Sequence, residues 1–256
     1  MKVVILAGGR GTRLAEETGV LPKPMVEIGG RPILWHIMKL YSHYGHNEFV
    51  ICLGYKGQVI RNYFANYWQH QNCTVHTAGG CGYQHGPVED WHIDLIDTGQ
   101  DTMTGGRIAA VKGRLNNEPF FLTYGDGVAD IDLDALVEFH NENDRLCTVT
   151  TVQPEGRFGV IETEDDGECV TRFSEKPRGD GTWINAGFFV CEPGVFDYID
   201  DSPQAIFEHD PMREMVLDGE LYAYRHTGFW KPMDTLGDKM QLEELWKTNP
   251  QWKVWE

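Results

Sequence analysis

The sequence predicts an α/β fold with a Rossmann-like, three-layer organisation, in which helices cover a mostly parallel mixed central sheet and small β insertions interrupt the core. The first third of the chain alternates short apolar runs with amphipathic stretches, a pattern typical of parallel strands joined by helices. A glycine-rich turn follows the first of these strands. No repeat, linker or low-complexity segment interrupts the 256 residues, so we expect a single domain over residues 1–256.

The first predicted strand is the aliphatic run from Val3 to Leu6, which is too short for a helix and ends at small residues. Three glycines within residues 8–11 follow it and leave the backbone open to a ligand. Successive N–H groups in such a turn form a concavity that suits an anion. Residues 1–24 also carry four basic side chains against two acidic ones, in a chain whose formal net charge is −17. The turn is therefore predicted to bind phosphate.

The next elements follow from the spacing of apolar side chains. Residues 31–45 are predicted to form an amphipathic helix, 48–53 a strand and 58–69 a second helix. Residues 70–101 contain several glycines and only 91–96 alternate as a strand would, so we expect an irregular, partly β excursion near the site. The histidines of this excursion lack the spacing typical of metal ligands.

The segment TMTGGR, residues 102–107, opens a short helical stretch that ends near Lys112. Its glycines and hydroxyls fit an ordinary helix start. They fit equally a close approach of the backbone to a flat base, with Arg107 reaching a phosphate. The residues themselves favour neither interpretation.

A continuous apolar strand over residues 119–124 leads into Gly125 and Asp126, ahead of a predicted helix. In open α/β sheets ligands lie beyond the carboxyl ends of the strands, so Asp126 is expected at the same edge as the glycine-rich turn. A carboxylate there can hold Mg²⁺ while phosphate and water complete the octahedron. We favour this role over turn formation for Asp126, and expect Asp130 only to cap the following helix.

The second half of the chain is predicted to add further strands and helices. The strands are residues 147–152, a hairpin of 157–162 and 168–174, then 183–191 and 221–225. Helical stretches are expected near 194–199 and 211–217, with a C-terminal helix at about 235–247.

Three polar residues stand out in this half. Pro177 restricts Lys176 to an extended backbone, which directs its side chain. Asn185 interrupts an apolar strand and needs a hydrogen-bond partner, either a sugar hydroxyl or the backbone. Asp234 could cap the last helix, but it also supplies a second carboxylate remote in sequence from Asp126. Two such carboxylates beside a basic phosphate loop are what a divalent-metal phosphoryl site needs.

Composition excludes several classes of protein. With 22 basic and 39 acidic residues, the chain lacks the basic face needed for nucleic acid or an anionic membrane. It contains no apolar run of about 18 residues and no charged leader, so we expect a soluble cytoplasmic protein. The six cysteines are scattered without a C-x-x-C spacing and are expected to be buried thiols.

The glycine-rich turn does not match the two best-known phosphate loops. A dinucleotide fingerprint needs a third glycine where Leu14 stands, and a Walker loop needs a lysine directly after Gly11. The pattern L-A-G-G-x-G-T-R-L followed by P-K-P resembles instead the signature of the sugar-1-phosphate nucleotidylyltransferases. The resemblance runs the whole length of the chain, through PKPMVEIGGRPILWHIMKLY, TMTGGR, TYGDGVADID, FSEKPRGDGTWINAGFF and GFWKPMDT.

This resemblance implies a fold and a set of site residues. It implies the nucleotidyltransferase fold, with the nucleotide held by Leu6, Ala7, Gly8, Gly9, Gly11, Thr12 and Arg13. It implies phosphate contacts from Arg13 and Lys23, a Mg²⁺ ion on Asp126 and Asp234, and catalytic roles for Arg13, Lys23 and Asp126. The same resemblance places Thr102, Thr104, Arg107 and Gly125 in the substrate site, and Glu175, Lys176 and Asn185 on its sugar-phosphate side.

The stretches look more like the cytidylyl branch of the family than the thymidylyl or uridylyl branches. This implies CTP and glucose 1-phosphate as substrates, CDP-glucose and pyrophosphate as products, and a homo-oligomer that supplies dideoxyhexose and surface-polysaccharide synthesis. The alternatives are a thymidylyl- or uridylyltransferase and a non-catalytic regulatory relative, but Lys23, Asp126 and Asp234 are all present. A metal-dependent glycosyltransferase would need a D-x-D, which residues 126–130 do not contain.

Overall fold

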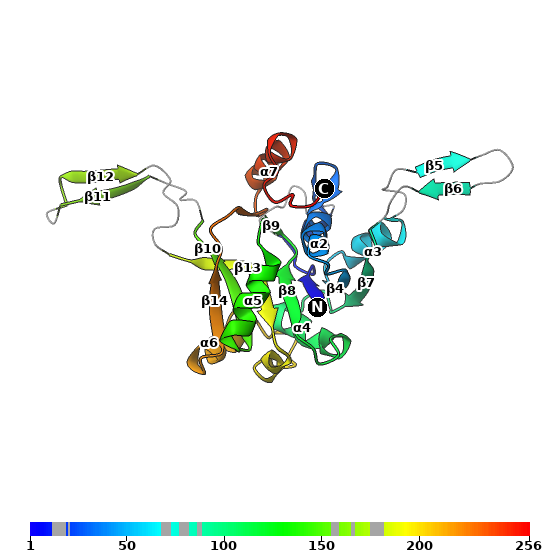
Figure 1. The fold of residues 1–256 in the computed structure, drawn as a ribbon, viewed down its shortest axis with the longest axis horizontal. Coiled ribbons are helices and arrows are strands. Elements are labelled where there is room, and N and C mark those ends of the chain that lie inside the picture. The colour runs from blue at the N-terminus through cyan, green and yellow to red at the C-terminus, as the bar shows by residue number, and fades with distance from the viewer. Residues whose placement is uncertain are drawn as a thin grey trace.

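The computed structural model describes residues 1–11, 19, 21–67, 73–76, 82–85, 89–154, 159–164, 167–174 and 182–256, with the main chain alone for 73–76 and 82–85. A seven-stranded sheet lies at the centre, helices cover it, and two strand pairs extend outward on opposite sides (Figure 1).

The central sheet is mixed and mostly parallel, as predicted. Its strand order is β14-β10-β13-β8-β1-β4-β7, and β13 runs antiparallel to both of its neighbours while the other pairs are parallel. The strands are β1 (Lys2–Leu6), β4 (Glu48–Leu53), β7 (His92–Asp97), β8 (Phe120–Tyr124), β10 (Cys147–Val152), β13 (Ile184–Cys191) and β14 (Leu221–Arg225).

The apolar run predicted at the N-terminus is an interior strand. β1 pairs in parallel with β4 on one side and β8 on the other. Because successive side chains of a strand point to opposite faces, Val3 and Ile5 pack into one hydrophobic cluster and Val4 into another. All three side chains are fully buried, so both faces of the sheet form core.

Helices cover these two faces as separate layers. The face of Val3 packs against α2 (Ile33–His43), α3 (Gly57–Ala65), α5 (Leu133–Asn143) and α7 (Leu236–Thr248). The face of Val4 packs against α4 (Thr104–Val111), α6 (Asp210–Leu217) and the short 3-10 helix η5 (Pro193–Asp197). The 3-10 helix η4 (Lys112–Arg114) follows α4 directly and contributes no buried residue. The predicted three-layer fold is therefore confirmed.

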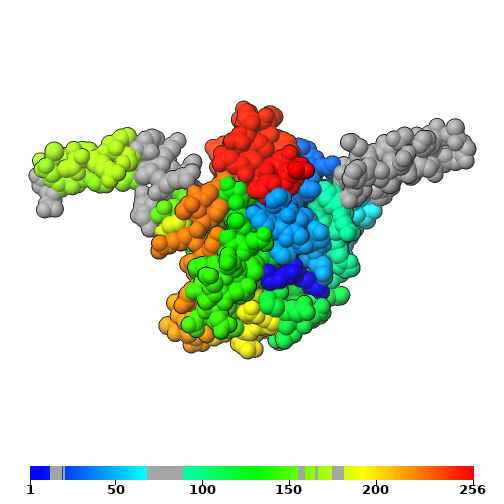
Figure 2. Space-filling model, viewed as in Figure 1, coloured from blue at the N-terminus to red at the C-terminus, as the bar shows by residue number. Residues whose placement is uncertain are grey.

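Four two-stranded pairs complete the fold. They are β2 (Glu27–Ile28) with β3 (Arg31–Pro32), β5 (Cys73–His76) with β6 (Gly82–His85), β9 (Gly127–Ala129) with β15 (Trp230–Pro232), and β11 (Val160–Thr163) with β12 (Val170–Ser174). The hairpin β11–β12 matches the predicted hairpin and projects from the body of the molecule (Figures 1 and 2).

The C-terminal segment, red in Figure 2, packs against the N-terminal half of the chain. Trp252 is 1% exposed, and its indole N–H donates to Nδ1 of His36 on α2 at 3.3 Å. The ring of Trp246 lies edge-on to His36, with 4.9 Å between the ring centroids. Gly29 must be a glycine here, because its φ is +60° and a Cβ would lie 2.0 Å from the Trp246 indole nitrogen.

The structure differs from the sequence-based predictions at several element ends. The helix predicted over 58–69 ends at Ala65, and the one predicted near 194–199 is the 3-10 helix η5. The prediction that Asp130 caps α5 is wrong, because Asp132 is the capping residue and accepts a hydrogen bond from the Ala135 N–H at 3.0 Å. The segments 70–72, 77–81 and 86–88 of the predicted excursion lie outside the described residues.

Three of the six cysteines, Cys52, Cys147 and Cys191, are buried free thiols as predicted, whereas Cys169 is exposed. Among the helices that the structure describes, none has the length and apolar character required to cross a membrane.

Candidate active site

A cavity of about 660 Å³ lies at the carboxyl ends of β1 and β8, where the sequence predicted the site. Its wall consists of the glycine-rich turn, residues 100–103 with the start of α4, the end of β8 with the residues that follow it, and three residues from elsewhere in the chain, Lys23, Pro24 and Glu208. These residues are Leu6, Ala7, Gly8, Gly9, Arg10, Gly11, Lys23, Pro24, Gln100, Asp101, Thr102, Met103, Thr104, Arg107, Tyr124, Gly125, Asp126 and Glu208.

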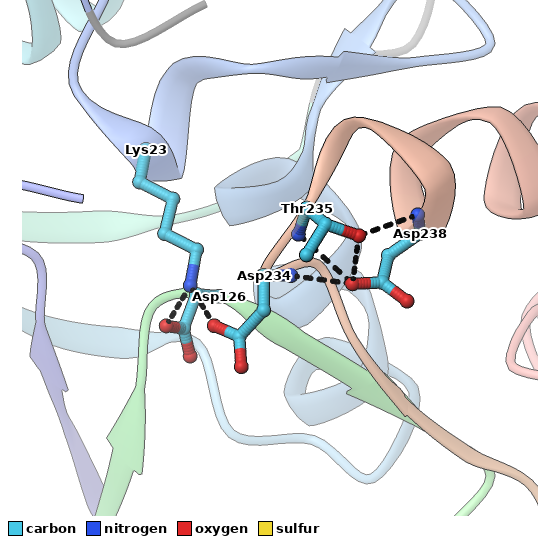
Figure 3. A network of polar contacts seen from close by, with 5 residues as sticks. All are labelled: Lys23, Asp126, Asp234, Thr235 and Asp238. Carbon is cyan, nitrogen blue, oxygen red and sulfur yellow. Dashed lines mark hydrogen bonds and ion pairs between the residues drawn. The ribbon is translucent and has the colours of Figure 1, made fainter. Parts of the chain in front are cut away.

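Lys23 and two aspartates form the charged centre of this site (Figure 3). Lys23 Nζ lies 2.6 Å from Asp126 Oδ2 and 2.6 Å from Asp234 Oδ1, so the ammonium bridges the two carboxylates. Lys23 belongs to the 3-10 helix η2 (Lys23–Met25) and is 8% exposed. The structure thus brings together three predicted residues that are far apart in the sequence.

The pairing of β9 with β15 places the two aspartates side by side. Gly127 lies opposite Pro232 in this antiparallel pair, and the Met233 N–H donates to the Asp126 carbonyl oxygen at 2.8 Å. Asp126 directly precedes β9, and Met233 alone separates Asp234 from the end of β15. The strand pair therefore holds both carboxylates at one end.

Asp130 fastens the other end of the same strand pair. Its Oδ1 accepts a hydrogen bond from the Phe229 N–H at 2.7 Å and lies 2.9 Å from Nε2 of His226. The Asp130 N–H in turn donates to the Phe229 carbonyl at 3.1 Å. These contacts explain why this aspartate is not the helix cap.

Asp234 does not cap the last helix either. Thr235 is the capping residue, and Asp238 completes a capping box with it. Asp238 Oδ2 accepts from the N–H groups of Asp234 at 3.2 Å and Thr235 at 2.9 Å (Figure 3). The backbone of Asp234 is thereby fixed by the start of α7, while its carboxylate faces Lys23.

The protonation state of Lys23 follows from its surroundings. Burial on its own would lower its pKa, but the charges and hydrogen bonds of Asp126 and Asp234 outweigh burial and raise the pKa above the ordinary value. Lys23 therefore stays positively charged at neutral pH.

The carboxylate pair has the donor chemistry of a magnesium site. Mg²⁺ takes oxygen ligands and is commonly held by one or two carboxylates together with substrate phosphates. Asp126 and Asp234 direct oxygens at one point, and the ammonium of Lys23 at that point shows that a cation is favoured there. These residues fit the predicted ion.

Arg107 lines the cavity and also joins three loops. Its guanidinium donates to the Gly8, Leu53 and Gly99 carbonyl oxygens and to the Thr98 hydroxyl at 2.7–3.0 Å. Burial lowers its pKa. A Cβ on Gly8 would lie 2.2 Å from Nη1 of Arg107, so this glycine is required by the packing of the guanidinium.

Thr104 is the first residue of α4. Asn185 lies on β13 and contacts Tyr124. The Asn185 amide donates to the Tyr124 hydroxyl at 3.1 Å, and its carbonyl oxygen accepts from the Gly187 N–H at 2.7 Å. The hydrogen-bonding need of Asn185 is therefore met within the protein, by the backbone, which was one of the two predicted alternatives, and by the Tyr124 side chain. Thr102 lines the cavity beside Thr104.

Sequence reasoning missed Tyr124, Glu208 and Asp238. Glu208 is remote from every motif that the sequence offers, and only the packing of the 202–208 segment on α4 brings it to the cavity. Tyr124 looked like the last residue of an apolar strand. Asp238 was recognisable as the N3 acid of a capping box after Thr235. Four predicted site residues, Thr12, Arg13, Glu175 and Lys176, lie outside the described residues.

Comparison with known proteins identifies the class. A family model described as nucleotidyl transferase matches residues 2–249, and the chain belongs to this nucleotidyl transferase family. It is also 52% identical to the glucose-1-phosphate cytidylyltransferase of Salmonella typhi over 260 residues, an alignment that covers all of both chains. The family expected from the sequence is thereby confirmed.

Solved structures share the fold. HddC from Yersinia pseudotuberculosis superposes with a TM-score of 0.68 at 25% identity, covering 96% of this chain and 99% of that one. A UDP-glucose pyrophosphorylase complexed with UDP-glucose superposes with a TM-score of 0.66 at 17% identity, covering 96% and 98%. The latter likeness supports the fold alone.

Proposed function

We propose that this chain is a glucose-1-phosphate cytidylyltransferase, which transfers a cytidylyl group from CTP to glucose 1-phosphate and releases pyrophosphate. The structural support is the position of Lys23 between Asp126 and Asp234, next to the glycine-rich turn. The choice of CTP and glucose 1-phosphate rests on the relative from Salmonella typhi, which is 52% identical over its full length.

The proposed reaction is an in-line displacement at phosphorus. A phosphate oxygen of glucose 1-phosphate forms a bond to the α-phosphorus of CTP, and the bond from that phosphorus to the bridging oxygen of pyrophosphate breaks. The electron pair of the broken bond leaves with pyrophosphate. Since the nucleophile is already an anion, no general base is required, and catalysis consists of positioning and of offsetting negative charge.

The residues around the cavity are suited to these two tasks. The turn from Ala7 to Gly11 offers backbone N–H groups for the triphosphate, and Lys23 supplies a permanent positive charge beside it. Thr12 and Arg13 continue the same motif and are proposed to contact the nucleotide and its phosphates. On the sugar side we propose Asn185, Glu175 and Lys176.

We also propose that Asp126 and Asp234 hold a Mg²⁺ ion. When bound, the ion would offset the charge of the phosphates at the reacting centre. The two carboxylates keep their orientation through the β9–β15 pair and the start of α7. Lys23 Nζ lies 2.6 Å from an oxygen of each carboxylate, so its side chain would lie next to the ion.

We further propose that the chain acts as one domain in a homo-oligomer. The hairpin β11–β12 supports this, since Ile161, Val170 and Phe173 are all more than half exposed on it. Light scattering of the purified protein tests this proposal, and a monomer at micromolar concentration would contradict it.

The experiment for the proposed function is product identification. Purified protein is incubated with CTP, glucose 1-phosphate and Mg²⁺, and both pyrophosphate and the sugar nucleotide are measured. We expect equal amounts of pyrophosphate and CDP-glucose, and neither product when glucose 1-phosphate is omitted. Binding of CTP without release of pyrophosphate would instead indicate a non-catalytic relative.

A further inference from the structure

A continuous series of hydrogen bonds joins three residues of the cavity wall, Thr104, Glu208 and Tyr124, and extends to Asn185 on β13. The Tyr124 hydroxyl donates to Glu208 Oε1 at 2.5 Å, and the Thr104 hydroxyl donates to Glu208 Oε2 at 2.6 Å. The Asn185 amide donates to the Tyr124 oxygen at 3.1 Å. Glu208 thus accepts a hydrogen bond at each of its two carboxylate oxygens, one from Tyr124 and one from Thr104.

The donor and the acceptor are fixed in each of these three hydrogen bonds. A carboxylate accepts and does not donate, so both hydroxyl protons point at Glu208. The Thr104 oxygen accepts from the Phe207 N–H at 2.9 Å, and the Asn185 oxygen accepts from the Gly187 N–H at 2.7 Å. Burial and the neighbouring Glu208 raise the pKa of Tyr124, so its hydroxyl keeps its proton.

Close packing brings Glu208 to this place. The Met103 N–H donates to the Pro203 carbonyl at 2.8 Å, and a Cβ on Gly105 would lie 2.9 Å from the Ala205 carbonyl oxygen. The segment 202–208 is therefore fastened to the start of α4. These contacts involve the backbone of the segment and do not depend on the side chain of Glu208, which lies in the cavity wall.

We propose that Glu208 is a positioning residue for both substrates. It orients Thr104 directly and Asn185 through Tyr124, which sets the nucleotide side and the sugar side of the cavity relative to each other. This inference rests on the proposed function, which assigns Asn185 to the sugar side. We further assign Thr104 to the nucleotide side, because it lines the same cavity as the glycine-rich turn. Tyr124 then transmits the effect of Glu208 to the sugar side only.

The first test replaces Glu208 by glutamine. Glu208→Gln keeps the size of the side chain, but its NH₂ group can only donate, so one of the two hydroxyls loses its acceptor. We expect kcat/KM to fall at least about tenfold when either CTP or glucose 1-phosphate is varied, with the melting temperature nearly unchanged. Glu214→Gln on the exposed side of α6 is the matched control and should behave like the wild type.

The second test separates the hydrogen bonds that lead from Glu208 to Asn185 from the bond between Glu208 and Thr104. Tyr124→Phe removes the link to Asn185 and leaves the Thr104–Glu208 bond in place. We expect KM for glucose 1-phosphate to rise at least about fivefold while KM for CTP stays within about twofold. This variant keeps its ring in the core, so it also decides the matter if Glu208→Gln fails to fold.

Two results would overturn the proposal. One is a Glu208→Gln protein that melts at a lower temperature but keeps both KM values and kcat, since that is the signature of a purely structural residue. The other is a Tyr124→Phe protein that loses affinity for CTP and not for glucose 1-phosphate. If the wild type uses another nucleotide in place of CTP, the proposed function fails, and the same variant-to-wild-type ratios measured with that nucleotide still test Glu208.

Discussion

The main-chain N–H of Met233 donates a hydrogen bond of 2.8 Å to the carbonyl oxygen of Asp126. This bond extends the β9–β15 pair by one residue, so that Asp126 lies opposite Met233, the residue before Asp234. Both carboxylates then reach the ammonium of Lys23 at 2.6 Å. The charge at the centre of the site is thus arranged by backbone pairing between segments about a hundred residues apart.

Replacing Asp126 by asparagine tests whether its charge is needed. Asp126→Asn keeps the size and turn preference of the side chain but removes the negative charge that fits Mg²⁺ and Lys23. We expect activity to fall about a hundredfold or more, with a melting temperature close to that of the wild type. The assay is pyrophosphate release at saturating Mg²⁺, and the exposed Asp201→Asn is the control. Near-normal turnover by Asp126→Asn would assign this residue to turn formation.

Lys23 and Lys176 are predicted to affect different kinetic constants. Lys23 lies beside the turn that we assign to the triphosphate, so Lys23→Ala should lower kcat by roughly tens to a hundredfold. Lys176→Ala should instead raise KM for glucose 1-phosphate far more than KM for CTP. Steady-state kinetics with each substrate varied in turn measures both effects, with the exposed Lys253→Ala as control. If Lys176→Ala weakened CTP alone, the two halves of the site would be assigned the wrong way round.

The turn itself offers a matched pair of variants. A Cβ on Gly8 would lie 2.2 Å from the Arg107 guanidinium, whereas a Cβ on Gly9 would meet nothing within 4 Å. Gly8→Ala should therefore displace Arg107 and lower both stability and activity. Gly9→Ala should keep the melting temperature and lose activity only, because its methyl group enters the space assigned to phosphate.

Thermal unfolding and turnover of the two variants are measured together. A chain of this size loses about 2–4 °C of melting temperature for each kcal/mol of stability, so the loss of two or more buried hydrogen bonds is detectable. Equal melting temperatures for Gly8→Ala and Gly9→Ala would show that a Cβ on residue 8 does not disturb the packing of the Arg107 guanidinium.

Much of this fold could be predicted from the sequence because its local signals are strong. Strands β4, β10 and β14 begin and end where the apolar runs do, since each is bounded by polar or turn residues. The glycine-rich turn, Lys23 and Asp126 were recognisable from their motifs. Asp130 was misjudged because its position before a helix resembles a cap, while its actual partners are remote in sequence.

The parts that could not be predicted depend on contacts between distant segments. The pairing of β9 with β15 joins two three-residue strands, which are too short to show a pattern. Glu208 reaches the cavity only because the 202–208 segment packs on two glycines of α4. Sequence spacing carries no information about such contacts.

His36 makes stability depend on pH. Its Nε2–H donates to the Ile28 carbonyl at 2.9 Å, and its Nδ1 accepts from the Trp252 indole, so the folded state needs the neutral ring. Burial lowers the pKa of His36 to about 4. An unfolded histidine titrates near pH ~6.5, so between about pH 6.5 and 4 the unfolded state binds a proton that the folded state does not.

Stability should therefore fall as the pH falls through this window, by up to about 1.4 kcal/mol per pH unit from His36. The free energy of unfolding is measured in denaturant at pH 7 and pH 5 for the wild type and for His36→Gln. The variant should lose less stability between the two pH values than the wild type does. An equal loss in both proteins would mean that His36 does not supply this pH dependence.

The choice of base is the most direct test of the proposed function. The measurement is kcat/KM for CTP, UTP and dTTP, each varied against saturating glucose 1-phosphate, with pyrophosphate release as the readout. Cytosine differs from uracil and thymine by an amino donor at C4, and we expect CTP to be preferred over dTTP by at least about tenfold, or roughly 1.4 kcal/mol. Equal or better turnover with dTTP or UTP would contradict the assignment as a cytidylyltransferase.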